Sequence, residues 1–468
     1  MHQQAIHVYD DIPPEDLAML QALYSRSPAS VTDHLEKVQA KGSGNFMDKF
    51  YVGYGHASIG DCGVTTVFIE NYSMLAAKAI QDNPLYSGQE ASTRYLDFST
   101  LPLVEPYNHP AAAAIQQGWM NMYNKYLPEV IAALQERYPF IQTGYKSEKI
   151  WQNAVNARAF DIMRGFLPVG TTTYLSWTTN LRQARQKLMK LKAHPLPEVQ
   201  DMAHNIFQQL YDKYPHSFTG QEMETDNPRY TARDAYNQRL AARENILTPQ
   251  ALLQRSELSA EELQHVQQGD FIARTHKLDR AGLNTHAQEA LTTRPDGAEL
   301  PRYLEKYGTY DFYFVLDFGS YRDLQRHRNG ICQVPLIDNT SGFYPWYLEE
   351  IRSLLPQSAP QIEAEIHRLL IAVEDLPQQG VTTTPEQNQY LYPMGMGLVC
   401  HLTYSVPQAT YVAELRSQKT VHASLRPIAQ HMARQLLTDF PTMTLFADFD
   451  ADSWSPKRGE QTIELKAG

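Results

Sequence analysis

The pentapeptide Phe166-Leu-Pro-Val-Gly170 occurs a second time in the chain, in altered form, as Leu391-Tyr-Pro-Met-Gly395. Both copies have a central proline and a terminal glycine, and they lie 225 residues apart. Each copy lies at the start of a stretch rich in β-branched and aromatic residues, at 166–178 and 397–404, as is typical of a β-strand. Helical patterns follow at 180–190 and 409–437. The repeated order predicts a tandem duplication.

Two further segments with strand patterns, 64–69 and 310–316, precede these copies, and a helical pattern at 14–39 opens the first unit. Asp82-Asn-Pro84 aligns with Arg326-His-Arg328 at an offset of 244 residues. Since the pentapeptides differ by 225, the first unit would hold an insertion of 19 residues between these two landmarks.

We therefore expect an α/β fold of the α+β type, in which two homologous units form a pseudo-dimer. Each unit would hold an antiparallel β-sheet flanked by helices. The predicted boundaries are 1–215 for the first unit, 216–270 for a helical connector and 271–468 for the second unit. Within the connector, Ser259-Ala-Glu-Glu262 has the pattern of a capping box, which begins a helix.

The composition is that of a folded protein with substantial cores, because 43% of the 468 residues are hydrophobic and 20% are charged. A net charge of −11 argues against a broad nucleic-acid or membrane surface, so any phosphate site must be local. The sequence has no secretory leader or membrane-spanning pattern, which favours a cytoplasmic protein. Cys62, Cys332 and Cys400 lack the spacing of a zinc site or a disulfide framework, so no metal is expected.

The stretch Ser87-Gly-Gln-Glu-Ala-Ser-Thr-Arg-Tyr95 holds an acid, a hydroxyl and a guanidinium at alternate positions. On an extended segment, Ser92 and Arg94 would point the same way and could bind a phosphate dianion, while Glu90 could accept hydrogen bonds from ribose or base. The alternative is a surface ion pair with no ligand.

The triplet Arg326-His327-Arg328 is the densest cationic motif of the second unit, and it follows a short helical pattern. Cations in a last helical turn can simply complement the helix dipole, an effect of up to about 1 kcal/mol. The functional alternative is that the planar guanidinium groups bind the diphosphate and ring edge of a flavin.

Joined together, these two motifs resemble the signature of the flavin-dependent thymidylate synthases. The first unit resembles this family also through Tyr54-Gly-His-Ala-Ser-Ile59, Arg164-Gly-Phe-Leu-Pro168 and Asn180-Leu-Arg182. The second unit resembles it more loosely, through Asp317-Phe-Gly-Ser-Tyr-Arg322, Tyr392-Pro393 and Glu414-Leu-Arg416. The resemblance covers most of the chain apart from the connector.

The resemblance implies a composite site to which each unit contributes part. The first unit would bind the nucleotide and the flavin, and the second would bind both and supply Arg416, which polarises the uracil. Arg426 is the competitor of Arg416 for that role. The implied nucleotide-binding residues are Glu90, Ser92, Arg94, Arg164 and Arg326; the implied flavin-binding residues are His56, Ser58, Asn180, Arg182, Arg326, His327 and Arg328.

The departures from the family pattern are complementary. Where the first unit should carry the cationic triplet it has Asp82-Asn-Pro84, and where it should carry the arginine that activates the base it has Leu191. Where the second unit should carry the Glu-Ser-Arg motif it has Val334, Leu336 and Asp338, and Gln389 stands opposite Arg164. One composite pocket could therefore persist while its mirror image is lost.

The implied reaction is the reductive methylation of dUMP to dTMP, with FAD as cofactor and with methylenetetrahydrofolate and NADPH as co-substrates. A family assembly of four subunits would correspond here to a homodimer of pseudo-dimers. Asp323 stands where the family usually has Gln, so a flavoenzyme that modifies another pyrimidine nucleotide is a second hypothesis. A binding protein for nucleotide or flavin that has lost catalysis is a third.

Overall fold

The computed structural model describes residues 11–27, 29–143, 146–219, 228–245, 251–252, 254, 256 and 258–450. Contacts between residues divide the chain into two compact units. Unit 1 comprises 1–72, 76–90 and 173–245, and unit 2 comprises 73–75, 91–172 and 246–468. Residues 91–172 thus fold with the second half of the chain. The predicted ranges 1–215 and 271–468 concern a repeat in the sequence, and they stay a prediction.

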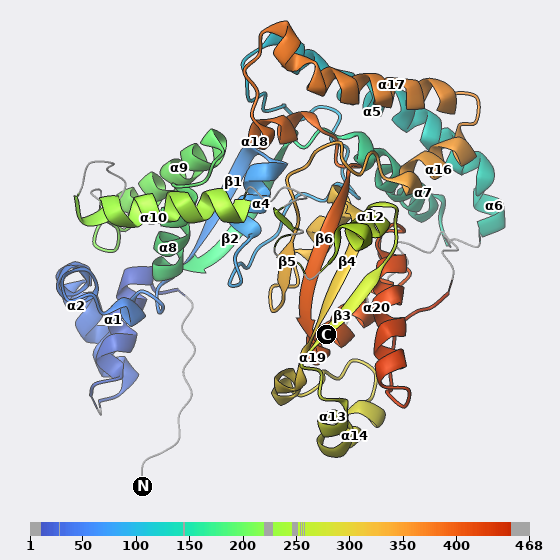
Figure 1. The fold of residues 1–468 in the computed structure, drawn as a ribbon. Helices are drawn as coiled ribbons and strands as arrows, with labels where there is room; N and C mark the ends of the chain where they lie inside the picture. The colour runs from blue at the N-terminus through green and yellow to red at the C-terminus, as the bar shows by residue number, and fades with distance from the viewer. Residues whose placement is uncertain are drawn as a thin grey trace. The chain divides into compact units, whose positions relative to one another are not determined.

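Unit 2 is built on a four-stranded antiparallel sheet with the strand order β3-β4-β6-β5 (Figure 1). The strands are β3 (Ile272–His276), β4 (Thr309–Asp317), β5 (Ile331–Gln333) and β6 (Gly397–Ser405). The central pair runs in register from Thr309 opposite Ser405 to Asp317 opposite Gly397. Both central strands are almost wholly buried, as their unbroken apolar runs require.

Helices cover this sheet and extend from it. Leu263 and Val266 of α12 (Ala260–Gln267) pack against Tyr313, Val315 and Val399 of the central strands. Ser259 caps α12 with the predicted capping box, in which its side chain accepts from the Glu262 N–H and Glu262 accepts from the Ser259 N–H.

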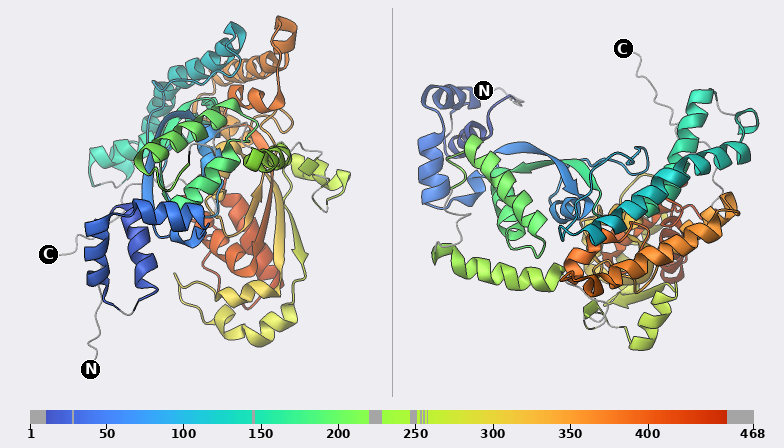
Figure 2. Two further views of the ribbon diagram at one scale, coloured as in Figure 1. Left: turned by 90° about the vertical axis from the view of Figure 1, so that its left-hand side faces the viewer. Right: turned by 90° about the horizontal axis from the view of Figure 1, so that it is seen from above.

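The long helix α5 (Pro110–Arg137) lies along α17 (Ala359–Glu374), as the views from two directions agree (Figures 1 and 2). The other helices of unit 2 are α6 (Phe140–Thr143), α7 (Glu148–Met163), η3 (Arg164–Phe166), α13 (Arg280–His286), α14 (Gln288–Thr292), η5 (Arg302–Tyr307), α15 (Phe318–Leu324), α16 (Pro345–Leu354), η6 (Leu376–Gln379), α18 (Pro385–Asn388), η7 (Gln389–Leu391), α19 (Val406–Ser417) and α20 (Arg426–Asp439).

Unit 1 holds the second sheet, in which β1 (Val64–Ser73) pairs with β2 (Thr172–Asn180). Its helices are α1 (Pro14–Tyr24), α2 (Val31–Lys41), α3 (Gly44–Phe46), the π-helix η1 (Met47–Gly53), η2 (Ala57–Ile59), α8 (Leu181–Leu191), α9 (Pro197–Lys213) and α10 (Pro228–Asn245). Helix α4 (Met74–Gln81) begins within the few residues assigned to unit 2. The fold class is therefore mixed α/β with two antiparallel sheets, as predicted.

Elements recur at the offset found in the sequence. The turns η3 and η7 begin at Arg164 and Gln389, and the strands β2 and β6 begin at Thr172 and Gly397, each pair 225 residues apart. The helices that follow are capped alike. Asn180 accepts from the Gln183 N–H before α8, and Ser405 accepts from the Gln408 N–H before α19.

The two copies of the pentapeptide pair with each other inside unit 2. Pro168 and Pro393 form an antiparallel bridge. Four backbone hydrogen bonds join the copies: Val169 N–H to Tyr392 O (2.8 Å), Met394 N–H to Leu167 O (2.8 Å), Gly170 N–H to Tyr390 O (3.1 Å) and Gly395 N–H to Gly165 O (2.8 Å). Each bond has its counterpart at the offset of 225 residues, so the bridge has local two-fold symmetry.

Three predicted element boundaries were wrong. The helical pattern at 14–39 forms two helices, because Ser30 begins α2 with its own capping box. The pattern at 409–437 also forms two helices, since α19 ends at Ser417 and α20 begins at Arg426 with Pro427 in its first turn. The strand expected from residue 166 begins at Thr172, because residues 164–166 form a 3-10 turn.

Candidate functional site

Helix α15 presents three polar side chains on one face of unit 2, because residues three apart lie together on a helix. Asp317 caps the helix by accepting from the Ser320 N–H at 2.8 Å, and Asp323 lies one turn further along. Asp317 and Ser320 are fully buried, whereas the Asp323 side chain is 14% exposed. The face thus runs from the core towards solvent.

Arg164 is bound to the buried end of this face. Its guanidinium donates to the Ser320 hydroxyl at 2.6 Å and to the Tyr347 hydroxyl at 3.4 Å, and it lies 3.7 Å from Asp317. Burial alone would lower the pKa of Arg164, but Tyr347 and Asp317 hold it above its ordinary value. Arg164 is a permanent buried cation.

Arg94 lies in a turn rather than on the extended segment predicted for it. The Ser92 carbonyl accepts from the Tyr95 and Leu96 N–H groups, so the chain bends because local hydrogen bonds compete with an extended conformation. The Arg94 guanidinium donates to both carboxylate oxygens of Asp161, at 2.6 and 3.1 Å, and its side chain is 15% exposed.

A buried network that the sequence did not predict connects Arg94 with Arg164. His422 lies in the break between α19 and α20, where its Nε2 donates to the Asp161 carbonyl at 3.1 Å. Ser424 donates to Asp317 at 2.6 Å and lies 2.7 Å from the Ser320 hydroxyl. Burial, Arg164 and Arg94 hold the pKa of His422 well below its usual value, so this histidine is neutral.

Asp323 lies where the arginines of both halves of the sequence converge. Its carboxylate is 3.8 Å from the Arg326 Nε. Burial alone would raise the pKa of Asp323, but the charges of four arginines outweigh it and hold the pKa below its ordinary value. These arginines are Arg416, Arg326, Arg164 and Arg94. Arg326 is the most open of those with measured side chains, at 53% exposure, so the cluster reaches solvent.

Arg416 is oriented by two acceptors on the segment that follows α15. Its Nε donates to His327 Nε2 at 2.8 Å, and its terminal nitrogen donates to the Asp323 carbonyl at 2.9 Å. Burial, with Arg416 next in effect, lowers the pKa of His327 to about 3. His327 is therefore a neutral acceptor, with its proton on Nδ1.

The competitor of Arg416 has a different environment. Arg426 is 2% exposed, donates from its Nε to the Ser417 carbonyl at 2.8 Å and lies 3.5 Å from Asp448. It begins α20, whereas Arg416 lies on α19, so the expectation that one helix carries both was wrong. The geometry at Asp323 favours Arg416 as the site residue.

The remaining predicted residues lie in unit 1. Glu90 accepts from the Gln81 side chain at 2.6 Å, and His56 and Ser58 are exposed. Asn180 uses its side-chain oxygen to cap α8, and Arg182 donates to Asp61 at 2.7 Å while remaining 36% exposed. Each of these residues is reachable from solvent or partly so within its own unit.

The positions that depart from the family pattern hold no cationic site. Leu191 is buried, and Asp338 accepts from the Thr340 N–H. Gln389 accepts from the Ile337 N–H at 3.2 Å and donates to the Glu386 carbonyl at 3.0 Å. Where Arg164 anchors a charge network, its counterpart Gln389 makes neutral backbone contacts.

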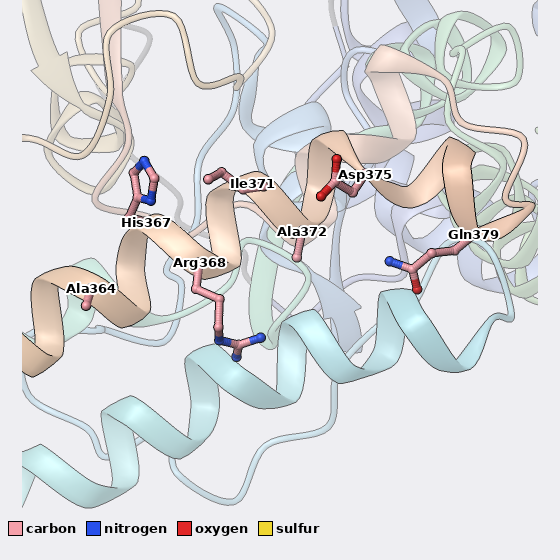
Figure 3. Close-up of a pocket in the computed structure, with 7 residues that line it drawn as sticks. All are labelled: Ala364, His367, Arg368, Ile371, Ala372, Asp375 and Gln379. Carbon is pink, nitrogen blue, oxygen red and sulfur yellow. The ribbon is translucent and has the colours of Figure 1, made fainter.

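Two other features have no part in this cluster. A surface hollow on unit 2 is lined by side chains of α17 and η6, among them His367, Arg368 and Asp375, and it includes no predicted site residue (Figure 3). Among the described residues, no group of three or more histidine, cysteine or acidic side chains could hold a metal ion, and no helix is long and apolar enough to cross a membrane.

Comparison with known families agrees with the first motif. Residues 9–216 match the model of the family described as thymidylate synthase complementing protein. Through these residues the chain belongs to the thymidylate synthase complementing protein family. The matched region contains Glu90, Ser92, Arg94 and Arg164, and the resemblance seen in the sequence is confirmed. Membership indicates a thymidylate synthase-type enzyme.

The chain is also similar to full-length proteins of comparable size. A UPF0159 protein of Chlamydia pneumoniae is 24% identical over 440 residues, which cover 86% of this chain and 80% of the relative. A UPF0159 protein of Thermoplasma acidophilum is 22% identical over 504 residues, which cover 96% and 98%. These relatives extend over both halves of the chain, so the long form is shared.

Proposed function

We propose that the chain is an FAD-dependent thymidylate synthase-like enzyme that converts dUMP to dTMP, with methylenetetrahydrofolate and NADPH as co-substrates. One observation supports this most strongly. Arg94 and Arg164 from the family region, and Arg326 and Arg416 from the second half, all act on the single carboxylate of Asp323. A cluster of four guanidinium groups at a partly exposed position is suited to a nucleotide phosphate.

Within this proposal, the phosphate binds at the exposed side of the cluster. Arg326 and Arg94 donate to it, and the Ser92 hydroxyl lies beside Arg94 on the same turn. Arg164 is too buried to contact a ligand directly, so it acts from behind the site through its positive charge. Its predicted role in direct binding is thereby narrowed.

Arg416 faces the site as a donor whose orientation is fixed by His327 and the Asp323 carbonyl. We propose that it stabilises negative charge that develops on the uracil ring, since an arginine does so without losing its proton. Glu90 would accept from the sugar or the base.

A flavin fits some of the predicted residues and not others. Arg326 and Arg182 are exposed cations, and Arg328 is partly exposed, so their guanidinium groups suit a diphosphate. His327 does not fit, because it is 6% exposed and its Nε2 already accepts from Arg416. The flavin, when bound, supplies the redox chemistry that the side chains of this cluster lack.

We further propose that the chain arose by tandem duplication and forms a pseudo-dimer that pairs again into a homodimer in the cytoplasm. The two-fold hydrogen bonds around Pro168 and Pro393 support the duplication, as do the matching caps at Asn180 and Ser405. On this proposal one nucleotide site per chain persists.

A second candidate is a flavoenzyme that acts on a different pyrimidine nucleotide. The observation that favours it is Asp323, whose carboxylate lies beside the proposed base-activating and phosphate-binding arginines. A carboxylate accepts hydrogen bonds and donates none, so it would select for donors on the sugar or the base.

The proposal is tested by titrating dUMP into the flavin-reconstituted full chain by calorimetry, with UMP and dCMP as competitors. Arg94→Ala and Arg326→Ala should each weaken dUMP binding at least about 30-fold, since each removes a charge-assisted hydrogen bond. Arg302→Ala is the matched control, because Arg302 also pairs with an acid three residues away but lies outside the cluster. Preference for UMP or dCMP would favour the second candidate. Absence of binding by all three nucleotides would contradict both.

A further inference from the structure

The arginine cluster contains an anion of its own. Asp317, Ser320 and Asp323 share one face of α15, and this face points its carboxylates at the guanidinium groups that would hold a ligand. Arg164 contacts the buried end of the face, and Arg326 contacts its open end. Asp323 is the member nearest to solvent.

The charges of the cluster are nearly balanced without a ligand. Four arginines face three aspartates, since Asp161 pairs with Arg94, Asp317 lies at Arg164, and Asp323 lies among all four. Buried like charges repel by several kcal/mol when the solvent between them is poor. Without Asp323, the empty cluster would hold two uncompensated cations.

We propose that Asp323 is an internal counter-ion that holds the empty arginine cluster together and competes with the ligand's phosphate for Arg326 and Arg416. This inference takes the site of the proposed function as the place where a phosphate monoester binds. Asp323 then has two opposed effects. It stabilises the protein without ligand, and it weakens phosphate binding, so that a ligand must supply further contacts to compete.

The contacts of Arg416 explain how both effects can operate at one residue. Arg416 is bound to the backbone carbonyl of Asp323 and to His327 rather than to the Asp323 carboxylate. Neutralising the carboxylate therefore leaves the orientation of Arg416 intact. It changes the charge of the cluster and not its architecture.

The test uses Asp323→Asn in the full chain, with inorganic phosphate as the probe at constant ionic strength. Phosphate binding and the melting temperature are measured across a phosphate titration. The variant should melt below the parent without phosphate and approach it at high phosphate, and its phosphate Kd should be at least roughly tenfold lower than that of the parent.

The control is Asp439→Asn, which removes an arginine-paired carboxylate of unit 2 outside the cluster. It should melt lower than the parent with no gain in phosphate affinity. A phosphate Kd for Asp323→Asn equal to that of the parent would overturn the proposal. So would failure of both Asp323→Asn and Asp323→Gln to fold in saturating phosphate, because a bound anion would then be unable to replace the carboxylate.

The outcome is separable from that of the proposed function. Tighter phosphate binding by Asp323→Asn upholds the internal counter-ion even if the parent neither binds nor converts dUMP. Conversely, conversion of dUMP by a parent whose phosphate affinity is unaffected by Asp323→Asn leaves the enzyme proposal intact and contradicts the counter-ion.

Discussion

The Nε–H of Arg416 donates to Nε2 of His327 across 2.8 Å, so a histidine from the cationic triplet orients an arginine 89 residues further along the chain. Because His327 is an acceptor here, it must be neutral and carry its proton on Nδ1. The interaction connects the end of α15 with α19 inside unit 2. It makes Arg416 a rigid donor rather than a mobile surface cation.

Arg416→Lys should therefore impair turnover more than binding. A lysine keeps the charge but cannot donate to His327 and to the Asp323 carbonyl in the fixed planar geometry of a guanidinium. We expect kcat to fall by about 100-fold or more, with a change of less than about fivefold in the Kd for dUMP. Single-turnover kinetics and calorimetry measure the two effects. An unchanged kcat would remove Arg416 from the proposed chemistry.

The buried neutral His327 should make the protein sensitive to acid. Its folded pKa of about 3 lies below its unfolded value, so its contribution to stability is complete above pH of about 6.5 and is lost as the pH falls towards 3. The loss should reach up to roughly 4 kcal/mol. His327→Gln, which cannot titrate, should flatten the dependence of the unfolding free energy on pH in this window.

The matched comparison is with His431→Gln, since His431 is less buried and its pKa is lowered more modestly. That variant should retain most of the acid sensitivity, as His422 and His327 both remain. Equal pH profiles for the parent and His327→Gln would contradict the assignment of His327 as a buried neutral group.

Arg164→Ala should unfold the protein more readily, because it leaves Asp317 charged and buried without its cation. Breaking a buried pair in this way costs about 3–5 kcal/mol. Denaturant unfolding of the full chain measures the change. A loss below about 1 kcal/mol would show that Asp317 is satisfied by Ser424, Tyr347 and the Ser320 N–H alone.

The two glycines that end the repeated pentapeptide should behave alike. A Cβ on Gly170 would lie 2.9 Å from the Tyr390 carbonyl, and a Cβ on Gly395 would lie 2.7 Å from the Gly165 carbonyl, at the symmetric position. Gly170→Ala and Gly395→Ala should each destabilise the protein by about 2–3 kcal/mol, since these backbone atoms cannot move independently. A harmless substitution at either glycine would contradict the close pairing of the two copies.

Local patterns predicted much of this fold. Runs of β-branched and aromatic residues located β1, β4 and β6, and the capping box at Ser259 located the start of α12. The offset between the pentapeptides anticipated the matching positions of β2 and β6. These features depend on neighbouring residues, and so the sequence displays them directly.

Features that depend on distant residues were not predictable in the same way. The break at 418–425 is stabilised by the contacts of His422 and Ser424 with Asp161 and Asp317, which no local pattern announces. Likewise, periodicity shows that α5 has an apolar face but not that this face packs on α17. For this reason the inclusion of 91–172 in unit 2 was not foreseen.

The arginine cluster falls between these cases. The motifs at 90–94 and 326–328 marked Arg94 and Arg326 as candidates, and the structure brings both to Asp323. The sequence could not show that His327 would be buried beneath Arg416, since burial depends on α19. Nor could it show that Arg164 would act from the core.

The account depends most directly on one nucleotide site per chain, built from both halves of the sequence. Equilibrium titration of the flavin-reconstituted full chain with dUMP, at a protein concentration well above the Kd, measures this stoichiometry. We predict one dUMP bound per chain, because the mirror positions hold Leu191, Asp338 and Gln389 in place of cationic groups. Two dUMP molecules per chain would show that each half has its own site and would contradict the composite cluster.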